Sequence, residues 1–187
     1  AERPDVSDDD RELRAFAKDL QQEVLAAAEQ EGDEGLLPHV FTRYMIEQVI
    51  AAGELTDGHQ VFFRRKGLEA SGYAVDDDET TLDLFVTVYT GAGEPATLKR
   101  DNVEKALKRV RKFFDKASTD LAESIEEASP AHDLALRVRE VAGRIDTLRL
   151  FFFTDGVTTL DYIAPEESGG LRTLVSLWDL RRLQRFV

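Results

Sequence analysis

Hydrophobic residues in the first part of the chain recur at helical spacing and predict a hairpin of two helices within residues 11–53. The apolar positions of the first helix are Leu13, Phe16, Ala17, Leu20, Val24 and Ala27. Those of the second are Val40, Phe41, Met45, Val49 and Ala52. Positions three and four apart share one face of a helix, and Ser7 or Asp8 can cap the first one. Residues 1–10 have little to bury and are expected to fray.

Three short extended runs follow within residues 60–89 and predict an antiparallel meander. They span 60–65, 68–75 and 80–89, and the connections between them are short and polar. In the third run, four apolar residues at period two lie on one face: Leu82, Leu84, Val86 and Val88. The opposite face then carries Asp83, Phe85, Thr87 and Tyr89.

Residues 101–187 are predicted to form helices before and after one buried strand. Residues 101–117 form an amphipathic helix, and a second helix precedes the run Leu148–Phe153. That run is apolar almost throughout, which is typical of a central strand covered on both faces. A short strand from Leu171 through Leu177 and a basic terminal helix complete the order. The order predicts an α/β fold similar to the restriction-endonuclease-like fold, a mixed sheet flanked by helices. We expect one core around Phe85, Val110, Phe114, Leu150 and Phe152.

Composition favours one domain in a reducing compartment. The 187 residues include 42% hydrophobic residues, which suffices for a single packed core, and no cysteine. No apolar run approaches the roughly 20 residues of a membrane span, so we expect a soluble, cytoplasmic protein without a membrane partner. The net charge of −13 opposes binding to phosphate backbones, so any contact with nucleic acid should be weak.

Three carboxylates could form a metal site of the nuclease type. Glu47 on the second helix, Asp76 at the end of a strand and Asp83 on the next strand could hold Mg²⁺, which activates water and neutralises phosphate charge. However, Thr87 and Tyr89 occupy the positions where a further carboxylate and a lysine would be expected. A surface pair with Arg43 is the simpler role for Glu47. For Asp83 the catalytic and structural interpretations stay open, because a buried carboxylate needs a partner in either case.

The helix at 101–117 concentrates positive charge in an acidic chain. Residues 99–116 hold eight basic and three acidic residues, whereas residues 1–35 hold four and twelve. The charges form a possible basic docking face: Lys105, Lys108, Arg109, Lys112 and Lys116. It is either a solvated helix face or a docking surface. With Arg64, Arg65 and Lys66, and with Arg181, Arg182 and Arg185, it could form one patch if these segments converge. Trp178 has apolar neighbours and is expected in the core.

Several motifs in order along the chain resemble the N-terminal domain of the abortive infection phage resistance (AIPR) family. They are Phe41–Glu47, Gly72–Asp76, Leu82–Val86, Glu127–Ala135, Phe153–Gly156 and Leu177–Leu180. The resemblance implies a role in bacterial phage defence. A larger C-terminal region follows this domain in the family, so the chain is expected to be a fragment of a longer protein.

The preferred interpretation is a non-catalytic, nuclease-like domain without a cofactor. Its partners would be another protein, a second copy or the C-terminal region of the full-length chain. A divergent Mg²⁺-dependent nuclease using Glu47, Asp76 and Asp83 is the alternative, and a nucleic-acid-binding module is a third possibility.

Overall fold

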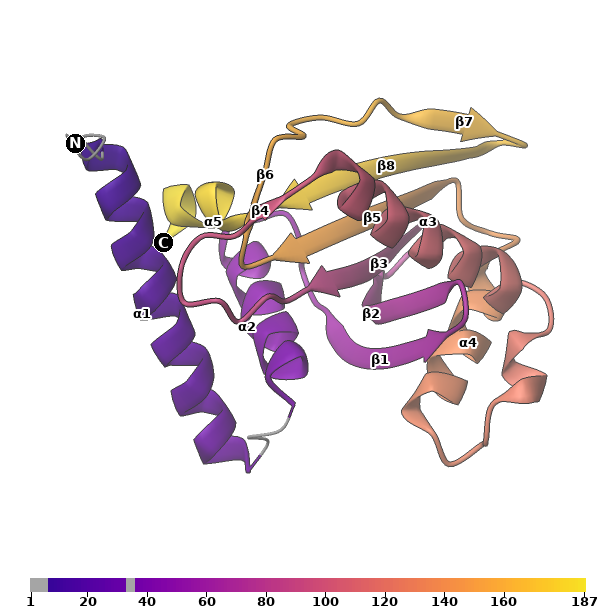
Figure 1. The fold of residues 1–187 in the computed structure, drawn as a ribbon. Helices are drawn as coiled ribbons and strands as arrows, with labels where there is room; N and C mark the ends of the chain where they lie inside the picture. The colour runs from indigo at the N-terminus through magenta and orange to yellow at the C-terminus, as the bar shows by residue number, and fades with distance from the viewer. Residues whose placement is uncertain (1–6, 33–35) are drawn as a thin grey trace.

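Helices cover both faces of one central sheet in the computed structural model, which describes residues 7–32 and 36–187 (Figure 1). The helices are α1 (Asp8–Glu31), α2 (Leu37–Ala51), α3 (Arg100–Ala117), α4 (Pro130–Val141) and α5 (Leu180–Phe186), with a 3₁₀ turn, η1 (Leu121–Ser124). The strands are β1 (His59–Arg65), β2 (Leu68–Val75), β3 (Thr81–Val88), β4 (Thr97–Leu98), β5 (Thr147–Thr154), β6 (Val157–Thr158), β7 (Glu166–Ser168) and β8 (Leu171–Trp178).

The main sheet has the strand order β1-β2-β3-β5-β8-β7. The first three strands form the antiparallel meander that the sequence predicted. Strands β3, β5 and β8 run parallel, and β7 returns antiparallel to β8. The turn between β1 and β2 places Gly67 at φ 77°, a left-handed conformation that glycine adopts without steric cost. Strand β5 is interior, as its apolar sequence predicted. The mixed, helix-flanked sheet is therefore confirmed, whereas the specific likeness to restriction endonucleases stays a prediction.

Helix α1 begins at Asp8, inside the segment of residues 1–10 that was expected to fray. The Ser7 side chain accepts a hydrogen bond from the backbone N–H of Asp10 at 3.2 Å, so Ser7 is the cap and the helix starts at Asp8. Three acids in the first turn interact favourably with the positive end of the helix dipole. The predicted helix start near Ser7 or Asp8 is therefore confirmed, and the prediction of fraying was wrong for residues 8–10. Residues 1–6 lie outside the described residues.

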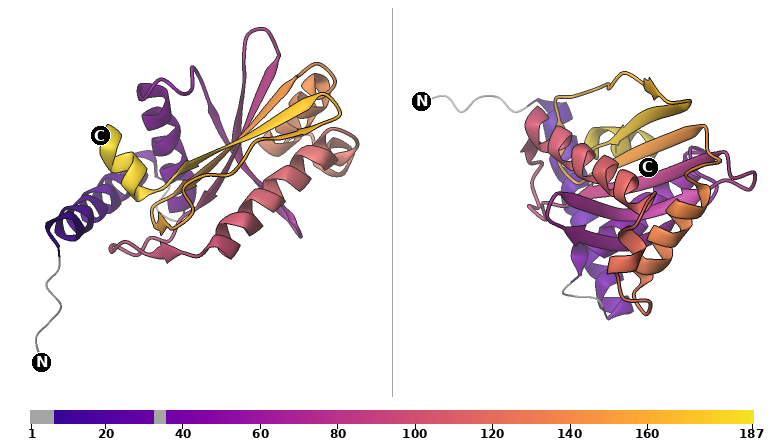
Figure 2. Two further views of the ribbon diagram at one scale, coloured as in Figure 1. Left: turned by 90° about the horizontal axis from the view of Figure 1, so that it is seen from above. Right: turned by 90° about the vertical axis from the view of Figure 1, so that its right-hand side faces the viewer.

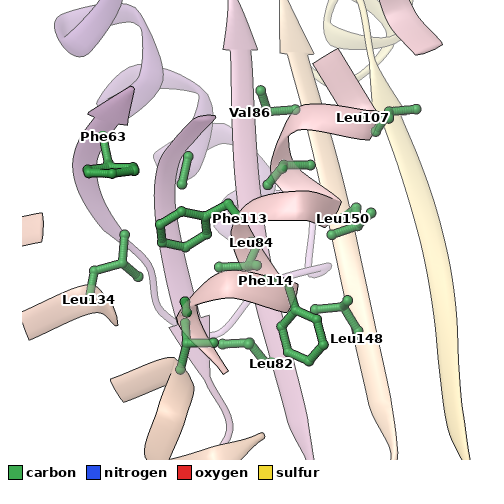
Figure 3. Packing of buried hydrophobic residues seen from close by; sticks show 14 of the residues in the cluster. Phe63, Leu82, Leu84, Val86, Leu107, Phe113, Phe114, Leu134, Leu148 and Leu150 are labelled. Carbon is green, nitrogen blue, oxygen red and sulfur yellow. The ribbon is translucent and has the colours of Figure 1, made fainter. Parts of the chain in front are cut away.

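The sheet separates two hydrophobic clusters. Leu82, Leu84 and Val86 pack with residues of α3 and α4 on one face, where Phe113 and Leu134 also lie (Figure 3). Phe85 points to the other face and packs with α1, α2 and α5. Figure 2 shows α3 on one side of the sheet and α2 and α5 on the other. The alternation along β3 was predicted correctly, but the single predicted core was wrong, because Phe85 lies across the sheet from Val110, Phe114, Leu150 and Phe152.

Strands β4, β6 and β7 were not predicted. Each has only two or three residues, too few for an alternating pattern to be visible in the sequence. Within residues 7–32 and 36–187, no helix combines the length and the apolar character needed to cross a bilayer.

Candidate functional site

Asp83 lies at the centre of the sheet and is bound by an arginine of the neighbouring strand. It faces Arg149 in the parallel register of β3 and β5. Arg149 donates from Nε to Oδ1 at 2.6 Å and from Nη2 to Oδ2 at 2.8 Å, so both carboxylate oxygens accept from one guanidinium. A third hydrogen bond, from Arg149 Nη1 to the backbone oxygen of Glu54 at 3.1 Å, fixes the arginine. A metal ion at Asp83 would have to displace these contacts.

Burial governs the electrostatics of this pair. The Asp83 residue is 5% exposed, and burial raises the pKa of its carboxyl above the ordinary value of 3.8. The hydrogen bonds and the charge of Arg149 oppose this shift, while the nearby charge of Asp76 adds a smaller increase. Asp83 therefore has the partner that a buried carboxylate requires, and that partner is a cation from the same sheet.

Asp76 closes the turn between β2 and β3. Its side chain accepts from the backbone N–H groups of Thr80 and Thr81 at 2.8 and 2.9 Å and from the Thr80 hydroxyl at 2.6 Å. Although burial acts in the opposite direction, these hydrogen bonds lower the pKa of Asp76. Residues 76–79 therefore form an ordered turn, in which Asp77 and Asp78 are exposed.

Glu79, at the end of this turn, joins the hairpin to the helical layer. It pairs with Arg137 of α4 and with Arg144 just beyond that helix. The hydrogen bond from Arg137 is the main cause that lowers the pKa of Glu79, followed by the one from Arg144. Glu79 is therefore held by two arginines.

Glu47 is exposed on α2 and forms no ion pair within the described residues. Arg43 pairs with Glu31 and donates to Gln60 at 2.9 Å, so the predicted Arg43–Glu47 pair does not form. The Thr87 hydroxyl of β3 lies 2.8 Å from the Thr42 hydroxyl. The ring of Tyr89, just after β3, packs on the ring of Phe41 with 5.1 Å between the ring centres. In the described part of the chain, no three acidic or histidine side chains are grouped closely enough to hold a metal ion.

A second polar network, which was not predicted, surrounds Glu54 between α2 and β1. The carboxylate accepts from Trp178 Nε1 at 3.2 Å and from the Ser176 hydroxyl at 3.3 Å, and it pairs with Arg182. The Arg182 guanidinium lies 4.2 Å from the centre of the Trp178 ring, a cation–π contact. Trp178 is fully buried, as predicted. This network joins α5 to the segment before β1.

The basic segments do not all converge into one patch. Helix α3 packs on one face of the sheet, whereas α5, which carries Arg181, Arg182 and Arg185, packs on the other. Of the first basic segment, Arg64 lies 3.8 Å from Glu69, and Arg65 donates to Ser124 at 2.6 Å. Glu69 is buried, which raises the pKa of its carboxyl, while the charges of Arg64 and Arg109 oppose that shift.

The possible basic docking face contains two groups of side chains on α3. Lys105, Arg109, Lys112 and Lys116 follow one another at intervals of four, three and four residues and form a single line along the helix. We call this line the basic stripe. Lys108 lies beside it, toward the edge where Arg100, Glu104 and Arg111 stand.

The sequence contains a signal for the pairing of Asp83. Arg149 is the only charged residue of β5, in a run predicted to be buried on both faces. A lone charge in such a strand requires a partner on an adjacent strand. The contacts of Glu54 had no comparable signal, because that residue lies in a loop.

A family model described as the abortive infection phage resistance protein N-terminal domain matches residues 41–185. The match confirms the resemblance seen in the motifs and includes the whole central sheet. No curated protein and no solved structure matches the chain.

Proposed function

Because the chain belongs to the family of abortive infection phage resistance protein N-terminal domains, we propose that it is a non-catalytic docking domain of a phage-defence protein. It has a nuclease-like arrangement without a working metal site. It makes protein–protein or self-association contacts, and the C-terminal region of the full-length chain is one candidate partner.

The pairing of Asp83 with Arg149 carries the non-catalytic part of this proposal. A metal-dependent nuclease needs carboxylate oxygens that are free to bind the cation. Both oxygens of Asp83 accept from Arg149, and those of Asp76 accept from the backbone and side chain of its own turn. Glu47 is the one exposed member of the three. These roles are structural and leave few free anionic ligands for a metal ion.

The basic stripe of α3 is the proposed docking surface. Its lysines, Lys105, Lys112 and Lys116, are exposed, and within the described residues none forms an ion pair. In a protein of net charge −13, such a line is a local site of positive potential that would attract an acidic segment. A second copy could supply this segment through the acidic start of α1, where Asp8, Asp9 and Asp10 are exposed.

Incubation with nucleic acid tests the non-catalytic part. The purified protein should leave single- and double-stranded DNA and RNA intact in Mg²⁺ and in Mn²⁺. The variants Glu47→Gln, Asp76→Asn and Asp83→Ala are prepared identically. Cleavage by the parent that is lost in these variants would establish the alternative Mg²⁺-dependent nuclease. Equal activity in all four preparations would indicate a contaminant.

Sedimentation at increasing protein concentration tests the self-association part. We expect an average mass that rises with concentration at low salt and falls when Lys112→Glu and Lys116→Glu are combined. Arg172→Glu with Arg185→Glu, on exposed residues of β8 and α5 that belong to neither the stripe nor α1, is the matched control for an equal change in charge. A monomer at every concentration would exclude self-association through this stripe and leave a different protein as the partner.

A further inference from the structure

A cavity of about 470 Å³ lies between α3 and the half of the sheet that contains β5 and β8. The parallel strands β5 and β8 are connected by a segment that passes over the sheet without forming a helix (Figure 1). Residues 159–165 of this connection, which we call the strap, include Tyr162, Ile163 and Ala164 on the wall of the cavity. A thin strap leaves the surface of β8 less covered than a helix would.

The floor of the cavity is apolar. It is formed by Leu150 of β5 and Val175 of β8, with Leu107 of α3 at the side. Tyr162 is 71% exposed, although a large aromatic side chain is usually buried more deeply than this. The volume falls within the roughly 300–1,000 Å³ of typical sites for small ligands. The cavity therefore offers an apolar bed and an aromatic ring to a molecule of small size.

The rim of the cavity is positively charged. Arg100 pairs with Glu104 at 2.8 Å, and Arg111 pairs with Glu166 of β7. Each arginine uses one nitrogen in its pair and keeps other N–H donors, since a guanidinium has five. Lys108 stands between the two arginines on the same helix, and within the described residues no carboxylate pairs with it. The two ion pairs neutralise Glu104 and Glu166, so the rim keeps one excess positive charge, that of Lys108.

We propose that this cavity binds a small organic anion with an apolar body, such as an aliphatic carboxylate or a mononucleotide. The apolar body would lie on Leu150 and Val175 beside Tyr162, and the anionic group would bind Lys108 with the spare donors of Arg100 and Arg111. A neutral molecule would lack the charged contacts with Lys108, Arg100 and Arg111. The proposal is independent of the docking role, because it rests on the cavity and not on the basic stripe.

A fluorescent probe with the same chemistry tests the site directly. The dye 8-anilinonaphthalene-1-sulfonate carries one sulfonate on an aromatic body, and its emission rises in an apolar site. Titration should give saturable binding with one site. Lys108→Glu should weaken it at least tenfold, because the charge beside the anion is reversed. Val175→Phe should weaken it to a similar extent by filling the floor.

The matched control is Lys18→Glu, which makes the same change in charge on an exposed lysine of α1. Helix α1 packs on the opposite face of the sheet from α3, so Lys18 does not reach the cavity. We expect its affinity to stay within twofold of the parent. Circular dichroism of each variant checks that the fold is intact, because the dye also binds proteins whose core has loosened. An equal loss in Lys18→Glu, or unchanged affinity in both cavity variants, would overturn the proposal.

Competition identifies which anion fits. Octanoate and adenosine monophosphate are added to the dye complex, with octanol and adenosine as neutral counterparts. Displacement by either anion, and not by its counterpart, supports the site and tells whether an aliphatic or a nucleotide body is preferred. Equal displacement by the neutral molecules, or no displacement by any of the four, would contradict it.

Discussion

Arg149 and Asp83 stabilise the centre of the sheet from within two adjacent strands. The side chain of Asp83 is 7% exposed and that of Arg149 is 32% exposed. A buried charge that loses its partner is costly, because neither water nor another group replaces the contact. Arg149 also donates to the backbone oxygen of Glu54, so the pair connects the sheet to the segment after α2.

Removal of one partner should therefore destabilise the protein. We expect Asp83→Ala to lower the free energy of unfolding by about 2–4 kcal/mol, somewhat below the usual range for a buried pair because Arg149 is partly solvated. In a cycle of the single variants Asp83→Leu and Arg149→Met and the double variant that combines them, the losses of the two single variants should not add, since no unpaired charge remains in the double variant. Urea denaturation measures Asp83→Ala and the three variants of the cycle. Additive losses, or less than about 1 kcal/mol for Asp83→Ala, would show that the pair is not coupled.

Glu79 should make the protein sensitive to acid. Its pKa is lowered in the folded state by Arg137 and Arg144, so the unfolded chain binds the proton more readily near its ordinary value of 4.5. The stabilisation is present above pH 4.5 and is lost as the pH falls through the lower, folded pKa. Glu79→Gln should be less stable than the parent at pH 7, and its stability should fall less steeply below pH 4.5. Asp78→Asn, an exposed neighbour in the same turn, should keep the slope of the parent in thermal melts from pH 3 to 7.

The sequence predicted those strands and helices that are long enough for their apolar residues to show a repeating pattern. The three strands of the meander, β5 and β8 alternate or are continuously apolar over several residues, and α3 shows a complete apolar face. The strap and β7 have no such pattern. An ion pair and a short ladder hold β7, and within the described residues the strap packs only Leu160 and Ile163 on the core. For the same reason the cavity beneath the strap was not predicted, although Lys108 on its rim was.

The central position of β5 gives its aromatic residues a large share of the stability. Phe152 is fully buried on the α3 face, so Phe152→Ala should cost roughly 3–5 kcal/mol of unfolding free energy. Phe62→Ala on β1 is the matched control, because that ring is 43% exposed and should cost less than about 1 kcal/mol. Denaturant melts compare the two. Similar small losses in both would place Phe152 outside the core.

The whole molecule is acidic, and its two basic helices face different directions. Helices α3 and α5 lie on opposite faces of the sheet, so their charges cannot act on one ligand together. This arrangement favours a local contact with an acidic or anionic partner over the extended basic surface that binds nucleic acid.

Binding to DNA should accordingly be weak at physiological salt and should fall steeply as salt increases. Fluorescence anisotropy with a labelled duplex measures both properties. A sub-micromolar dissociation constant that persists when the salt is doubled would contradict this expectation and favour a nucleic-acid-binding module. Charge reversal at Lys105, Lys108 and Lys112 would then show whether α3 carries the binding.

The parallel contact between β3 and β5 also bears on the order in which the chain folds. Asp83 and Arg149 are 66 positions apart, whereas the turns of the meander join neighbours in the sequence. Closing the longer loop costs more chain entropy, so we expect the meander to form first and the two halves of the sheet to join late. Until they join, both charges stay in water and incur no cost of burial. Changes at this pair should then accelerate unfolding more than they slow folding.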